Sequence, residues 1–181
     1  MVKSLFVLFL LSFNHTVSQN KWSIEFRPDI NFPTSDFGDS KIKTGYGFEL
    51  TGGYRFMAHL SAYAGWGFNT FKIEDSNFDF DETGYTFGLQ FIHPLGTSET
   101  LSYLLRAGAT YNHIELENTD GDIVSDSDHG FGYQVEAGLN YHLGLGWDLR
   151  PTVRYRALSR DMDIDNTTRY IDLNYLSFGL G

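Results

Sequence analysis

The chain has 181 residues, a formal net charge of −10 and no cysteine. The acidic balance argues against nucleic-acid binding, which calls for a basic face. The lack of cysteine excludes disulfides, thiolate metal sites and a lipid-modified N-terminal cysteine. Aromatic residues make up 17% of the chain, yet the mean hydropathy is only −0.26. This composition is too polar for a bundle of membrane-spanning helices, but it fits a chain in which only alternate strand residues face lipid.

The N-terminus has the features of a secretory signal peptide. Lys3 provides a positive charge, residues 5–13 form an apolar run, and residues 16–18 are small enough for cleavage. We therefore expect residues 1–18 to be a signal peptide and residues 19–181 to form a single domain. The alternative, an uncleaved anchor, requires a run of about twenty apolar residues, far longer than this one.

The rest of the chain repeats an alternation of apolar and polar residues. In the clearest case every second residue from Phe131 to Leu143 is apolar or aromatic, and polar residues and glycines lie between them. The segments with this pattern are residues 22–32, 44–56, 60–71, 83–93, 101–112, 131–143, 147–158 and 170–181. A period of two predicts a β-strand at each segment, with one face toward hydrocarbon and the other toward polar groups.

Two of these segments are irregular. Pro28 interrupts the first because it has no N–H to donate, so we expect a local bulge or break there. In the last segment Leu176, Phe178 and Leu180 keep one phase, whereas apolar residues before them keep the other. This change of phase indicates either a bulge near Tyr175 or a barrel top that stands above the lipid.

Short and long connections alternate between the expected strands. Residues 57–59, 94–100 and 144–146 are short, whereas residues 33–43, 72–82, 115–130 and 159–169 are longer and polar. Bacterial membrane barrels have short periplasmic turns and long extracellular loops. The sequence therefore predicts an all-β fold, an eight-stranded antiparallel up-and-down transmembrane β-barrel with both termini in the periplasm. A soluble lipocalin-like barrel is the alternative, but it would turn its apolar face inward.

Segments such as GYGFELTGGYRF (residues 45–56) and YLSFGLG (residues 175–181) carry a resemblance to a known family. The chain resembles the small OmpA/OmpX-like outer-membrane β-barrels, in the form common in Bacteroidetes-like sequences. The resemblance covers nearly all of residues 19–181. It implies a place in the outer membrane of a Gram-negative cell envelope, with membrane lipid and lipopolysaccharide as neighbours.

The expected inward face carries charges of both signs. Eight strands enclose a lumen about wide enough for side chains, so we expect no continuous aqueous channel. Buried charges must pair, because an unpaired buried ion costs several kcal/mol. We predict a ladder of ion pairs with Glu49 and Glu136 against Arg106 and Arg154. Such a ladder would act as a polar plug that fixes the strand register; the alternative is a proton- or ion-gating network.

The expected loops are strongly acidic. In the last loop Asp161, Asp163 and Asp165 are spaced like the first carboxylates of a calcium-binding loop, with Asp172 at the twelfth place. The match is weak because Asn166 stands where glycine is wanted. We expect either simply solvated loops or low-affinity Ca²⁺ or Mg²⁺ bridging between the loops and lipopolysaccharide phosphates.

No sequence motif indicates catalysis or a cofactor. Some eight-stranded barrels modify lipid A and place a serine beside a base at the outer rim. His113 and His129 flank the third long loop, but neither forms a His-x-Ser motif. We expect a non-enzymatic, monomeric protein with a structural role in the envelope or a surface-interaction role through its acidic loops. The alternative is a narrow porin-like conduit for small solutes.

Overall fold

The computed structural model describes residues 21–36, 40–164 and 167–181. The expected signal peptide, residues 1–18, lies outside this part of the chain. Within it all regular secondary structure is β-strand. None of these residues forms a helix long and apolar enough to cross a bilayer.

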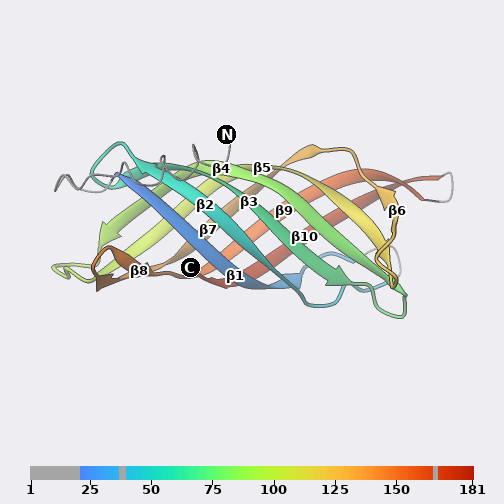
Figure 1. Ribbon diagram of the computed structural model, residues 1–181, viewed down its shortest axis with the longest axis horizontal. Coiled ribbons are helices and arrows are strands. Elements are labelled where there is room, and N and C mark those ends of the chain that lie inside the picture. Colours follow the sequence, from blue (N-terminus) through green and yellow to red (C-terminus); the bar gives the residue numbers. More distant parts are fainter. Residues whose placement is uncertain (1–20, 37–39, 165–166) are drawn as a thin grey trace, which may run out of the picture.

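The described residues form ten strands, which cross the long axis of the molecule obliquely (Figure 1). They are β1 (Trp22–Pro33), β2 (Gly45–Arg55), β3 (Leu60–Lys72), β4 (Phe78–Pro94), β5 (Leu101–Asn118), β6 (Ile123–Asp126), β7 (Gly130–Gly144), β8 (Trp147–Leu149), β9 (Pro151–Ile164) and β10 (Thr167–Leu180). All pairings are antiparallel.

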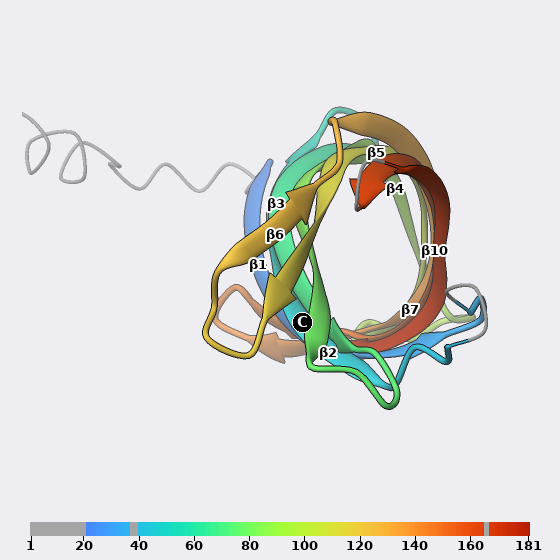
Figure 2. The ribbon, with the colours of Figure 1, turned by 90° about the vertical axis from the view of Figure 1, so that its right-hand side faces the viewer.

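Eight of the strands close into a ring. Neighbouring strands from β5 back to β1 pair in sequence order, β1 pairs with β10, and β10 continues through β9 to β7. The pairing of β7 with β5 closes the ring, which Figure 2 shows end on. The two short strands only extend this ring. β6 pairs with the C-terminal end of β5, and β8 pairs with the C-terminal end of β7. The prediction of an eight-stranded antiparallel up-and-down barrel is confirmed.

Several strands are longer than the sequence predicts. β4, β5 and β9 run through residues 78–82, 115–118 and 159–164, which the sequence assigns to loops. The expected bulge at Pro28 is also wrong, because β1 pairs with β2 in unbroken register from Trp22 to Asn31. Pairing with β10 starts at Asp29, directly after the proline.

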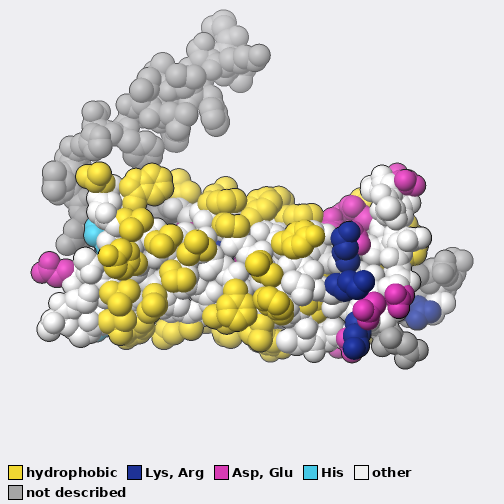
Figure 3. Space-filling view, turned by 90° about the horizontal axis from the view of Figure 1, so that it is seen from below, with side chains coloured by type: hydrophobic (Ala, Val, Ile, Leu, Met, Phe, Trp, Pro, Cys, Tyr) yellow, Lys and Arg dark blue, Asp and Glu magenta, His cyan; other side chains and the backbone are white. Residues whose placement is uncertain are grey.

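The outer wall of most of the barrel is apolar. Figure 3 shows hydrophobic side chains over much of one face, with Lys, Arg, Asp and Glu gathered toward one end. Outward side chains such as Phe26, Leu50, Phe87, Val135 and Phe178 are between 44% and 58% exposed. The alternation of the strands places glycines and polar side chains on the opposite face, inside the ring. This is the inside-out distribution of a barrel that stands in a bilayer.

The distribution reverses at the end of the barrel that carries the long loops. There a cluster of inward side chains forms an apolar cap, and polar residues face outward. The apolar cap consists of Ile42, Phe71, Ile73, Phe80, Ile114, Leu116, Leu158, Met162, Ile171, Leu173 and Tyr175. On β10 the reversal occurs between Tyr175 and Leu176 with no register shift against β9. The irregular last segment is therefore a barrel top with inverted polarity, and the alternative of a bulge near Tyr175 is wrong.

Candidate functional site

A network of five arginines and five carboxylates fills the middle of the lumen. This charged plug consists of Glu25, Arg27, Asp29, Glu49, Glu82, Arg106, Glu136, Arg150, Arg154 and Arg156. Each member is at most 8% exposed. The members come from β1, β2, β4, β5, β7 and β9 and from the residue between β8 and β9. The equal numbers of positive and negative groups allow every charge to be compensated inside the wall.

Arg27 and Glu49 lie at the centre of the charged plug. Arg27 donates to Glu49 at 2.7 Å and to Glu136 at 2.7 Å. Glu49 also accepts from Arg154 at 3.0 Å and from Arg156 at 2.7 Å. One carboxylate therefore joins three guanidinium groups from two strands across the lumen. Several attractive contacts to each buried charge offset the free-energy cost of its desolvation better than a single isolated ion pair does.

The four residues named from the sequence all belong to the charged plug. Arg106 contacts Glu136 at 3.2 Å, and Arg154 contacts Glu49 at 3.0 Å. Arg27 connects these two pairs, because it contacts both carboxylates.

Two further members lie outside the four named residues: Asp29, on the polar face expected for residues 22–32, and Glu82, which the sequence reasoning missed. Asp29 accepts from Arg154 at 2.6 Å, and Glu82 accepts from Arg156 at 2.9 Å. Glu82 was expected in a loop, but it lies on the inward face of β4. Thr86 and Gln90 point inward on the same strand, and Glu82 is an even number of residues before each of them. The period-two alternation of that strand is therefore the signal that could have placed Glu82 inside the barrel.

Tyr63 fills the space beside the charged plug. Its ring lies under the guanidinium of Arg106, 5.3 Å from the centroid, and its hydroxyl accepts from Gln134 at 3.1 Å. A Cβ at Gly108 would lie 2.6 Å from the tyrosine hydroxyl. The glycine on β5 therefore leaves room for a large side chain from β3.

The lumen opens at the end with the short turns. A cavity of about 960 Å³ begins there and is lined by Ser23, His59 and His142, among others. Its lining also includes Glu25, Gln90 and Arg150, where the charged plug begins. Beyond the charged plug the apolar cap occupies the far end. The cavity is thus a vestibule that ends inside the barrel, at the charged plug.

The calcium-loop hypothesis is not supported by the geometry. Asp161 and Asp163 lie in extended conformation on β9 and are paired with β10, whereas a calcium loop must turn so that its alternate carboxylates converge. Asp163 already accepts a hydrogen bond from Thr168 at 2.6 Å. Asp165 lies outside the described residues.

These features define an integral β-barrel of the outer membrane. The chain belongs to the family described as outer membrane protein beta-barrel domain, whose model matches residues 4–181. No curated protein matches the chain.

Solved structures of small outer-membrane proteins share the fold. Neisserial surface protein A (NspA) is 17% identical, with a TM-score of 0.58 over 88% of this chain and 96% of its own. OprG from Pseudomonas aeruginosa is 13% identical, with a TM-score of 0.60 over 88% and 92%. AlkL is 17% identical, with a TM-score of 0.57 over 92% and 90%. At these identities the likeness concerns the fold alone.

Proposed function

We propose that the protein is a closed outer-membrane barrel with a structural role in the envelope or a surface-interaction role through its acidic extracellular rim. The charged plug is the observation that carries this proposal. Its ten side chains span the lumen and bond to one another, so an ion that entered would have to displace paired charges. The apolar cap adds a second barrier, because its side chains other than that of Tyr175 carry no polar group that could replace the water around a hydrated ion.

The outer end is built for contact with water and headgroups. At this end, beyond the apolar part of the outer wall, the outward residues are mostly acidic or hydroxyl-bearing. On β9, for example, Asp161 and Asp163 are exposed. Membrane lipid and lipopolysaccharide are the expected neighbours of this surface, and a single chain closes the ring without a partner. The name of NspA describes that protein as a surface protein, which is compatible with such a role.

We further propose that the protein is not an enzyme. Ser125 on β6 is engaged elsewhere, since it donates to the backbone carbonyl of Asp163 at 2.6 Å. His113 contacts Asp126 at 2.9 Å instead of a serine hydroxyl. This arrangement supports the absence of a Ser-His nucleophile at the rim.

The rival hypothesis is a narrow porin-like conduit, and single-channel recording separates the two. The refolded protein is first tested for a gel-mobility shift on boiling, so that only folded barrels are counted. It is then added to planar bilayers in 0.15 M and in 1 M KCl, on the order of physiological and fully screening salt. A closed barrel gives no discrete steps above the bare bilayer at either salt. Reproducible steps from a heat-shifting preparation would overturn the proposal and favour the conduit.

A further inference from the structure

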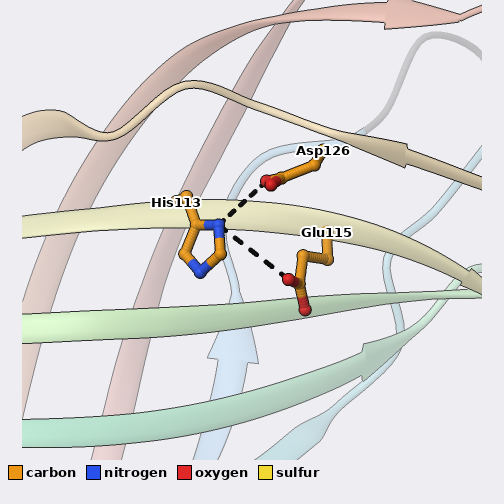
Figure 4. A group of neighbouring side chains, drawn as sticks. All are labelled: His113, Glu115 and Asp126. Carbon is orange, nitrogen blue, oxygen red and sulfur yellow. Dashed lines mark hydrogen bonds and ion pairs between the residues drawn. The ribbon is translucent and has the colours of Figure 1, made fainter. Parts of the chain in front are cut away.

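Three potential metal ligands converge on the outer wall of the barrel. His113 and Glu115 lie two residues apart on β5, and Asp126 lies directly opposite Glu115 on β6. Nδ1 of His113 is 2.9 Å from Oδ1 of Asp126 and 3.9 Å from Oε1 of Glu115. All three ligand atoms lie within 4.8 Å of one another, and Figure 4 shows the side chains pointing toward a common point.

The cluster lies just above the apolar band. Tyr111, the preceding outward residue on β5, is part of the aromatic wall and contacts Phe131 at a ring distance of 5.0 Å. His129 stacks on His113 at 4.3 Å and also contacts Tyr111. The site is therefore at the level of the lipid headgroups, with aromatic rings on one side and water on the other. The side chain of Asp126 is 48% exposed, so an ion has direct access.

The ligand set selects a class of metal. Zn²⁺ binds imidazole nitrogen and carboxylate oxygen at about 2.0–2.2 Å, so two of its ligands can lie up to about 4.2 Å apart. The two distances from His113 fall inside this limit, and a small rotation of Glu115 brings the third ligand into reach. Ca²⁺ and Mg²⁺ prefer sites made only of oxygen ligands. We infer that His113, Glu115 and Asp126 form a binding site for Zn²⁺ or a similar divalent first-row transition metal.

Carboxylates continue from the cluster onto the neighbouring strand. Asp81 lies opposite Glu115 on β4, and its Oδ1 is buried with no hydrogen-bond partner among the described residues. Asp79 lies opposite Glu117 on the same two strands, so neighbouring carboxylates repel one another along this row. A bound divalent cation would reduce the repulsion between these carboxylates, so their arrangement favours cation binding at the cluster.

The other end of the barrel provides a matched control. His142 contacts Asp148 with the same Nδ1–Oδ1 distance, 2.9 Å. There the third neighbour is Arg150, whose guanidinium is 3.3 Å from Asp148 and neutralises it. The pair therefore has the same histidine–aspartate geometry without a second carboxylate.

Isothermal titration of ZnCl2 into the untagged, refolded protein at pH 7.5 tests the site. We expect one ion per chain, and we expect His113→Gln and Asp126→Asn each to weaken binding at least tenfold. His142→Gln should stay within twofold of wild type. Each variant is first checked for its heat-dependent gel shift, so that a loss of binding is not a loss of folding. At pH 5.5 wild-type binding should also be at least tenfold weaker, because protons compete for the imidazole.

Three results would overturn the inference. The first is wild-type affinity no greater than that of the folded His113→Gln variant. The second is an equal loss in His142→Gln, which would indicate nonspecific binding to histidine–carboxylate pairs. The third is tighter binding of CaCl2 than of ZnCl2 in the same titration, which would assign the site to an oxygen-preferring ion.

Discussion

Replacing Glu49 by glutamine should destabilise the barrel more than any exposed charge change. The variant keeps the shape of the side chain but removes its negative charge from among three guanidinium groups. It also points an amide N–H toward groups that can only donate. Glu49 is 2% exposed, so water cannot replace the lost interactions without repacking.

The magnitude follows from the three contacts. Hydrogen bonds to charged groups are worth about 1.5–3 kcal/mol each and are not additive within a network. Removal of one partner from a buried ion pair costs about 3–5 kcal/mol, mainly because the other charge stays buried. We expect Glu49→Gln to lower the free energy of unfolding by about 3–5 kcal/mol.

Urea unfolding of the protein in lipid vesicles measures this change. The outward tryptophans Trp22, Trp66 and Trp147 report on the loss of the lipid environment, and the heat-dependent gel shift gives a second reading. Glu99→Gln is the matched control, because Glu99 is exposed in the connection between β4 and β5. It should change stability by less than about 0.5 kcal/mol. A loss of less than about 1 kcal/mol for Glu49→Gln, or an equal loss for both variants, would refute the reasoning about the charged plug.

Two further substitutions test the outer end of the barrel. Phe71→Ala should lower the free energy of unfolding by about 3–5 kcal/mol, because Phe71 is fully buried in the apolar cap. Phe87→Ala, which removes a lipid-facing ring, should lower it clearly less. Equal losses in the two variants would argue against a packed cap. The pKa of Asp81 is raised by burial and by Asp79, against a hydrogen bond from Thr70. Since a raised pKa means that the folded state prefers the protonated form, Asp81→Asn should be more stable than wild type at pH 7 in the same urea assay. This advantage should shrink as the pH falls toward 4; a constant or reversed difference would contradict the assignment.

The period-two alternation was sufficient to predict the ring of strands but not where the strands end. Residues 113–117 alternate polar with apolar as regularly as the membrane segments do. The acids Glu115 and Glu117 favour a loop that begins at residue 115, although Ile114 and Leu116 point into the apolar cap. The reason is that the outward environment changes from lipid to water at this level, so the polarity of each face inverts while the strand continues.

The membership of the charged plug was largely predictable, whereas its connections were not. The strand phase places Glu49, Arg106, Glu136 and Arg154 inside. The contact of Arg27 with Glu136 joins residues 109 positions apart across the lumen. That contact depends on the register and tilt with which the ring closes, and these are properties of the whole barrel. The cluster around His113 depends in the same way on the pairing of β5 with β6.

The central claim is that the lumen is open at the short-turn end and closed beyond the charged plug. The chain has no cysteine, so single cysteine variants can be labelled without background. Ser23→Cys lies in the vestibule, whereas Ser177→Cys replaces a residue that is 1% exposed among the charged plug. A water-soluble maleimide should label the folded Ser23→Cys variant rapidly and leave Ser177→Cys unlabelled until the barrel is unfolded. Comparable labelling of both folded variants would mean that water and solutes pass through the lumen, and the account of a closed barrel would be wrong.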